Sequence, residues 1–197
     1  MAKVRSDLVE ERMSDSVWRI PFTGTNIAVL ADCHIHQGGA QFPAALFPRL
    51  QGADLIVTLG DMGERVGLDQ LQEIAPVLGV RGVDDDDDIR TRRSVLTLDG
   101  DGYRVGCVFD AKAAGLAQDV DPFIASKDAP QVAQRLFGGK IDILLHASTH
   151  RADEARFGGG SALNPGSAVL PAGGSRPSFL RLKVAREGCY GQVIWVA

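Results

Sequence analysis

The stretch NIAVLADCH, residues 26–34, opens the part of the chain in which the fold can be recognised. An apolar run from Ile27 to Ala31 ends abruptly in the polar side chains of Asp32 and His34. Such a run is typical of a strand that is buried on both faces and carries chemistry at its carboxyl end. A carboxylate and an imidazole two residues apart, just past a strand, can both face one cation.

Three further apolar runs end in polar residues in the same way. They are DLIVTLGD (residues 54–61), VLGVRG (residues 77–82) and KIDILLHASTH (residues 140–150). Residues 41–54 predict a short helix closed by Gly52, and residues 68–76 predict another that stops before Pro76. The order strand, helix, strand, helix, strand favours parallel pairing with helical crossovers. Because open α/β sheets bind ligands outside the carboxyl ends of their strands, the polar residues at these ends are candidates for one site.

The second half of the chain changes character. Residues 93–109 predict a hairpin turning at residues 99–102, and a helix is expected from Asp128 to Phe137. Residues 158–170 are glycine-rich and favour a turn, whereas residues 178–197 predict a terminal antiparallel hairpin. Residues 1–25 have weak periodicity and are predicted to form an N-terminal extension, with a short helix around Asp7 to Met13. Residues 26–197 are predicted to form a single domain. The predicted fold class is α/β with mixed sheets.

The composition is that of an ordinary globular protein. The chain has 197 residues, of which 45% are apolar and 23% charged. It contains no run near the roughly 20 apolar residues that span a bilayer, and its first 15 residues lack the apolar core of a secretory signal. Three widely separated cysteines, Cys33, Cys107 and Cys189, argue against a disulfide framework. A cytoplasmic location without membrane contact is therefore expected.

The acidity of the chain comes from one local feature. The formal net charge is -4, and Asp84 to Asp88 are five consecutive carboxylates, so that without them the sum is -4 + 5 = +1. By default such a run is a solvated loop held apart by self-repulsion. No basic stripe with interleaved aromatic residues is present, so nucleic-acid binding by charge is not supported.

Five blocks of the sequence, in order, resemble a known family. The chain is similar to the small bacterial and archaeal branch of the calcineurin-like metallophosphoesterases, whose signature is D-x-H, G-D, G-N-x-D, H-G and G-H-x-H. The matching blocks are Asp32-Cys33-His34, Gly60-Asp61, Gly82-Val83-Asp84-Asp85, Phe109-Asp110 and Ala147-Ser148-Thr149-His150, followed by LNPGS at residues 163–167. The resemblance spans about residues 26–185. It implies a sandwich of two mixed β-sheets flanked by helices.

The resemblance also implies a metal centre, of which this chain retains one half. One ion of the family is held by the residues that stand here as Asp32, His34, Asp61 and His150. The second ion shares the G-D aspartate and adds three ligands, whose positions here are Val83, Phe109 and Ser148. Every loss falls on that second ion, so about one bound ion is expected. Candidate replacement ligands are Asp85, Asp110 and His146.

Two classes of function follow from this half-site. Mixed oxygen and nitrogen ligands suit manganese, iron, zinc or nickel, and such an ion favours a phosphoesterase of reduced activity acting on a small phosphomonoester or phosphodiester. The alternative is a catalytically inactive binding or scaffolding module, as the retromer subunit of this superfamily exemplifies. The sequence leaves the substrate, the metal and the oligomeric state open.

Overall fold

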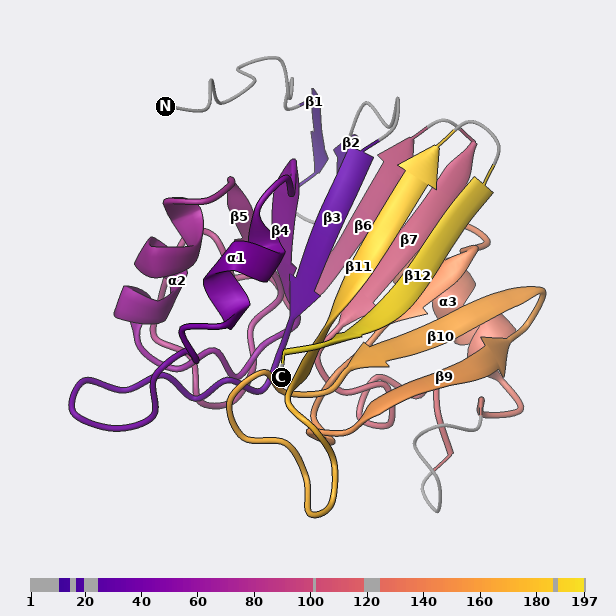
Figure 1. Ribbon diagram of the computed structural model, residues 1–197. Helices are drawn as coiled ribbons and strands as arrows, with labels where there is room; N and C mark the ends of the chain where they lie inside the picture. Colours follow the sequence, from indigo (N-terminus) through magenta and orange to yellow (C-terminus); the bar gives the residue numbers. More distant parts are fainter. Residues whose placement is uncertain are drawn as a thin grey trace.

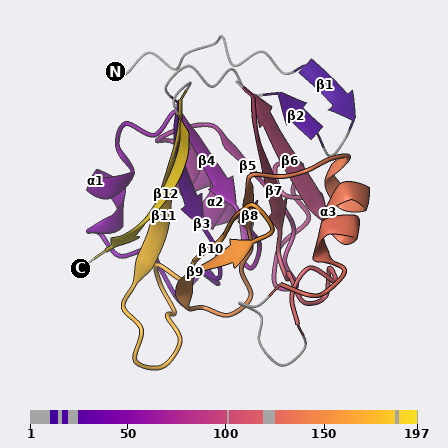
Figure 2. The ribbon, with the colours of Figure 1, turned by 90° about the vertical axis from the view of Figure 1, so that its right-hand side faces the viewer.

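The computed structural model describes residues 11–14, 17–19, 25–100, 102–118, 125–185 and 188–196. Two β-sheets face each other, with helices against their outer faces (Figures 1 and 2). The prediction of a sandwich of two mixed sheets flanked by helices is confirmed. Within the described residues, no helix is long and apolar enough to cross a membrane.

The first sheet has five strands in the order β12-β11-β3-β4-β5. β3 (Thr25–Leu30), β4 (Leu55–Thr58) and β5 (Val77–Gly79) are parallel to one another. β11 (Ser178–Ala185) is antiparallel to β3, and β12 (Gly188–Trp195) is antiparallel to β11. The predicted terminal hairpin is thus confirmed, and it adds two strands to the parallel strands that lead to the site.

The second sheet has seven strands in the order β1-β2-β6-β7-β8-β10-β9, in which β1 is Glu11–Ser14 and β2 is Val17–Arg19. β6 (Val95–Gly100) and β7 (Tyr103–Val108) form the predicted hairpin, and β7 is parallel to β8 (Ile143–Leu145). β10 (Gly160–Pro165) lies between β8, to which it is parallel, and β9 (Ala152–Phe157), to which it is antiparallel. Both sheets are therefore mixed.

Apolar residues form three layers around the sheets. The central layer lies between the two sheets, and it includes Val29, Val57 and Leu145. Helices α1 (Leu46–Leu50) and α2 (Arg65–Gln72) cover the first sheet, whereas α3 (Ala129–Phe137) covers the second. α3 ends at Phe137, as the sequence predicts, and is followed by Gly138, whose φ of 69° lies in the left-handed region.

Two sequence expectations were wrong. The glycine-rich stretch 158–170 contains strand β10 and not only turns. Gly160, the first residue of β10, lies so close to the Asp142 carbonyl that a Cβ atom would not fit, so this glycine allows close backbone packing and does not mark a turn. Where a helix was expected around Asp7 to Met13, Glu11–Ser14 form strand β1, and the residues before it lie outside the described part of the chain. β1 pairs with β2 (Val17–Arg19), and β2 pairs with β6.

Candidate metal centre

The predicted ligands share an unusual backbone conformation. Five non-glycine residues of the described chain have positive φ: Asp32 (52°), His34 (47°), Asp61 (49°), Ser148 (70°) and His150 (57°). Four of them are the predicted ligands of the retained ion, and the fifth stands at a position of the second ion. Each such residue costs about 1–3 kcal/mol and persists only where its surroundings enforce it, as they often do in functional sites.

Backbone pairing brings the loops that follow β3 and β4 together. Asp32 N donates to Gly60 O over 3.1 Å, and His34 N donates to Asp61 O over 2.9 Å. A Cβ atom on Gly82 would lie 2.1 Å from Asp61 N, so only glycine lets the chain after β5 pass this close. The three parallel strand ends therefore converge beside Asp61.

Asp32 connects this group of loops to the chain segment after β8. It is fully buried, and its two carboxylate oxygens accept hydrogen bonds from Ser148 N (3.3 Å) and His150 N (3.1 Å). Burial raises the pKa of Asp32 to about 6, an effect that neighbouring His150 partly offsets. Asp32 is buried and is repelled by the charge of Asp61, so a cation bound between the two carboxylates would stabilise their ionised forms.

The two predicted histidine ligands are held in parallel. The rings of His34 and His150 stack, with centroids 5.2 Å apart and an interplanar angle of 12°. His150 Nδ1 is 2.7 Å from the carbonyl of Leu170 and therefore donates to it, which leaves Nε2 as an acceptor. His34 Nε2 lies 3.8 Å from Asp61 Oδ2. Asp32, His34, Asp61 and His150 thus lie on adjoining loops, and oxygen and nitrogen donors of these types suit a divalent transition ion.

The LNPGS segment supports the same loops. Ser167 Oγ donates to Asp32 O (2.7 Å), and it accepts from the backbone amides of residues 169 and 170. The buried Asn164 side chain donates to Ala147 O (3.2 Å) and to Thr149 Oγ1 (3.1 Å). The segment therefore does more than close the fold, because it ties the backbone of Asp32 to the loop that carries His150.

The aspartate run is not the self-repelling loop that its charge suggested, because each aspartate has its own partner. Asp84 contacts two histidines, Asp86 accepts from Arg65 N, and Asp87 pairs with Arg81. Asp88 pairs with Arg90, and Asp85 accepts from three backbone amides. Five carboxylates in sequence thus point to five different places.

The positions of the lost second ion differ in their surroundings. Phe109 is partly buried against the central core, and its ring lies over Gly60. Val83, in contrast, is 89% exposed, so its side chain is directed into solvent and is not packed in the interior. Ser148 lies beside the predicted centre, where its amide is bonded to Asp32.

The three candidate replacement ligands have other surroundings. Asp85 Oδ1 accepts from Met62 N (2.6 Å) and Gly63 N (3.2 Å), and its Oδ2 accepts from Gly82 N (2.6 Å). Asp110 Oδ1 accepts from the amides of the following turn, at residues 112 and 113. His146 is buried, which lowers its pKa to about 4, and the charges that act on it are Asp153 and Asp110. The hydrogen bonds of the Asp85 and Asp110 side chains go to backbone amides and not to the four predicted ligands. The pKa of Asp85 is raised by burial and, to a smaller extent, by the charge of Asp61.

Two neighbours of His34 were not anticipated as site residues. Within the described chain, His34, His36 and Asp84 form a group whose potential ligand atoms all lie within 4.8 Å of one another. His36 belongs to none of the five sequence blocks, and Asp84 was only one member of the acidic run. The spacing of His34 and His36 in the sequence offers a weak signal, but their shared contact with Asp84, about 50 residues away, is a tertiary feature.

Asp85 gives a first test of this arrangement. Replacing Asp85 with Asn puts an NH₂ group against a backbone amide that now has an acceptor, so we expect a loss of about 1–3 kcal/mol in the free energy of unfolding. Urea denaturation in the presence of a chelator measures it. The matched control is Asp87→Asn, which removes one exposed pair with Arg81 and costs about 0–1 kcal/mol. Equal losses in the two variants would contradict the role given to Asp85.

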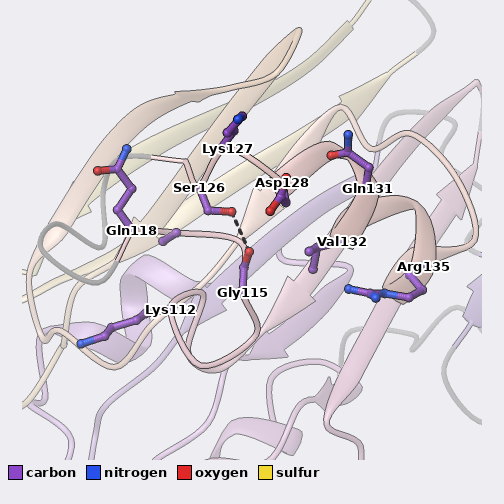
Figure 3. Close-up of a pocket in the computed structure, with 10 residues that line it drawn as sticks. Lys112, Gly115, Gln118, Ser126, Lys127, Asp128, Gln131, Val132 and Arg135 are labelled. Atoms are coloured by element: carbon purple, nitrogen blue, oxygen red, sulfur yellow. Dashed lines mark hydrogen bonds between the residues drawn. The ribbon is translucent and has the colours of Figure 1, made fainter.

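A separate cavity lies between α3 and the loop after β7 (Figure 3). It has a volume of about 920 Å³, and three cations, Lys112, Lys127 and Arg135, stand around it. Figure 3 shows that these three side chains do not converge on one place. The cavity shares no residue with the predicted metal centre.

A sandwich of two mixed sheets with carboxylates and imidazoles at its strand ends defines a protein of the metallophosphoesterase class. The family model described as the calcineurin-like phosphoesterase superfamily domain matches residues 26–187, so the chain belongs to that superfamily. The resemblance inferred from the five sequence blocks is thereby confirmed.

Individual relatives agree with this family. A protein of Methanothermobacter thermautotrophicus named "probable metallophosphoesterase" is 29% identical over 171 residues, which cover 85% of this chain and 91% of that protein. Two solved structures share the fold. A predicted phosphoesterase from Streptococcus pneumoniae has a TM-score of 0.61 at 17% identity and covers 88% of this chain and 91% of its own. Vps29 from Entamoeba histolytica, complexed with Zn²⁺, has a TM-score of 0.61 at 18% identity and covers 88% and 100%.

Proposed function

We propose that the protein is a phosphoesterase with one metal ion, held by Asp32, His34, Asp61 and His150. The observation that carries the proposal is the left-handed backbone at these four residues, which the surrounding hydrogen bonds enforce. Manganese, iron, zinc or nickel would suit this donor set. The substrate class is a small phosphomonoester or phosphodiester, which fits the family and the absence of a basic stripe in the sequence.

The residues of the chain would divide the work as follows. An ion at this centre acidifies a water molecule and polarises a phosphoryl oxygen. Asp32 and Asp61 supply the negative charge that holds the ion, and the two histidines present Nε2 atoms from stacked rings. Val83, Phe109 and Ser148 lack the side chains that would bind a second ion. Since two ions clamp both the attacking and the leaving oxygen, we expect slow hydrolysis by this chain.

The alternative is an inactive binding or scaffolding module. Two observations favour it: the three lost ligands, and the Vps29 proteins among the structures that share the fold. One of those is a Vps29 from Chaetomium thermophilum complexed with a cyclic peptide. The alternative predicts the same metal centre without turnover, so the two functions differ in chemistry and not in fold.

The location we propose is the cytoplasm. The chain has three cysteines, and all three are free thiols in the structure, with Cys33 and Cys107 buried. Reduced cysteines suit a reducing compartment. Burial raises the pKa of the Cys33 thiol far above its usual value, so this residue is not a reactive thiolate between two predicted ligands.

Metal content and activity of the unmodified protein test the proposal together. We expect about one divalent ion per chain by elemental analysis, and weak hydrolysis of a p-nitrophenyl phosphodiester that depends on added manganese. One ion without any hydrolysis would favour the scaffolding module. Two tightly held ions with rapid turnover would show that a replacement ligand set exists and that the centre is not degenerate.

A further inference from the structure

Asp84 touches two of the predicted ligands at once. Its Oδ2 lies 2.6 Å from His34 Nδ1, and its backbone amide donates to Asp61 Oδ1 over 2.8 Å. The same Oδ2 lies 3.0 Å from His36 Nε2. Asp84 belongs to the loop after β5, whereas both histidines belong to the loop after β3, so these contacts join two segments.

We propose that Asp84 is a positioning residue of the metal centre, which fixes the tautomer and the orientation of His34, and that His36 holds Asp84 in place. The proposal rests on the metal centre proposed above, and it identifies the residues that hold one ligand of that centre, His34, in place. It gives a function to an aspartate that the family signature leaves unspecified.

The donor geometry follows from elementary chemistry. An ionised carboxylate only accepts hydrogen bonds, so the proton of the neutral His34 ring must lie on Nδ1. Its Nε2 then carries a lone pair, and this is the atom that lies 3.8 Å from Asp61 Oδ2. Ligating histidines commonly donate their second ring nitrogen to a carboxylate or a carbonyl, which fixes the ring and raises its basicity.

His150 provides an internal comparison for His34. Its Nδ1 donates to the carbonyl of Leu170, and its ring stacks on that of His34. In both rings, therefore, Nδ1 is hydrogen-bonded to an oxygen atom, and Nε2 remains available to bind a metal ion. The difference is that a neutral carbonyl supports one ring and a carboxylate supports the other.

His36 restrains a carboxylate that would otherwise be mobile at the surface. The Asp84 side chain is 40% exposed, and an exposed carboxylate with one contact would be a weak support. His36 adds a second contact to the same oxygen, and His36 Nδ1 lies 3.6 Å from Glu64 Oε1. Glu64 Oε2 accepts from the backbone amide of Gln37, the residue after His36.

A rival arrangement uses the same atoms differently. An ion could be bound directly by His34, His36 and Asp84, whose ligand atoms lie within 4.8 Å of one another. Such an ion would bind through His34 Nδ1, the nitrogen that faces Asp84, whereas the proposed centre needs His34 Nε2. One imidazole serves both ions only if it loses both ring protons, so the two arrangements exclude each other and can be separated by experiment.

The first measurement needs no metal. Nitrogen chemical shifts of the His34 ring, measured by NMR on the metal-free protein at a pH where the ring is neutral, report which nitrogen carries the proton. We expect Nδ1–H in the unmodified protein and a shift towards Nε2–H in Asp84→Ala. Asp87→Ala is the control, because it lies in the same run but pairs with Arg81. An unchanged His34 tautomer in Asp84→Ala would overturn the proposal.

The second measurement is the affinity for Co²⁺, by competition with a chelator, together with the absorption spectrum of the bound ion. We expect Asp84→Ala to weaken binding by about 10-fold or more while saturating at the same stoichiometry. Asp84→Glu should recover part of the affinity, His36→Ala should have a smaller effect than Asp84→Ala, and Asp87→Ala should have none. A melting temperature unchanged without metal excludes a general folding defect.

The outcomes separate this proposal from the metal centre itself. If His36→Ala abolishes Co²⁺ binding, the ion is bound directly by His34, His36 and Asp84, and the positioning role is wrong. If Asp84→Ala binds Co²⁺ as tightly as the unmodified protein, the role is also wrong. If the unmodified protein shows the Nδ1–H tautomer but takes up no Co²⁺, the metal centre is wrong while the control of the His34 tautomer by Asp84 stands.

Discussion

Asp61→Ala is expected to lower the metal content of the purified protein from about one divalent ion per chain to none. The Asp61 carboxylate faces His34 Nε2 through Oδ2, and its Oδ1 already accepts from Asp84 N. The variant removes a ligand and also the anchor of the loop that carries Asp84. A centre that loses one charged ligand and the support of a second ligand keeps little affinity for a divalent ion.

The matched variants separate metal loss from misfolding. Alanine at a φ of 49° is strained, whereas asparagine tolerates this conformation, so Asp61→Asn tests the charge with less change of backbone energy. Asp110→Ala should retain the ion, because the Asp110 contacts lie within its own turn. Elemental analysis after dialysis measures the content, and melting with a chelator measures the fold. Retention of one full ion by Asp61→Ala would remove Asp61 from the ligand set.

The sequence predicts the ends of the buried strands well, because apolar runs and their polar exits are local features. The run Ile27 to Ala31 fixes where β3 stops, and the same argument applies to β4 and β8. β9 and β10 escaped prediction for a physical reason. β9 reads ADEARF and is half exposed, while β10 begins with a glycine that a neighbouring backbone requires. Neither strand shows the continuous apolar run of a buried strand.

The support of the site could be predicted less well than its ligands. The ligand types and order follow from the sequence blocks, whereas partners of Asp84, Asp85 and Asp86 lie in loops about 20 to 50 residues away. Asp85 illustrates the difference. Its alignment with a family aspartate made it a candidate ligand, but three backbone amides occupy it. Adjacent carboxylates therefore differ in role because their tertiary contacts differ.

The combined variant Val83→Asn, Phe109→His and Ser148→His is expected to raise the metal content from about one ion towards two, and to increase hydrolysis of phosphodiesters. Residues 109 and 148 are well placed for this. The Phe109 ring lies over Gly60, next to Asp61, and the Ser148 amide is bonded to Asp32. Residue 83 is the least favourable position, since Val83 points into solvent and an asparagine there must turn inward.

Single replacements should change little, because a second ion needs most of its ligands at the same time. The three substitutions are therefore expected to be non-additive, and the increase in metal content should emerge only when they are combined. The structural cost lies mainly at residue 109, where an imidazole replaces a phenyl ring packed against the central core. A buried polar group without a partner costs about 1–3 kcal/mol, which a bound ion would offset.

A second combined variant is needed as a control for the loss of packing in the variant that restores the three ligands. Val83→Ala, Phe109→Leu and Ser148→Ala together alter the same positions without adding a ligand, so the melting temperature of this control measures the loss of packing alone. Added manganese should stabilise the restored variant more than the packing control, because binding of a second ion favours the folded state. If the restored variant folds as well as the control yet still binds one ion with unchanged turnover, then the absence of these three ligands is not what limits the centre. The geometry of the loop that carries Val83 and Asp84 would then be the limiting feature, because it directs Asp84, and not residue 83, towards His34.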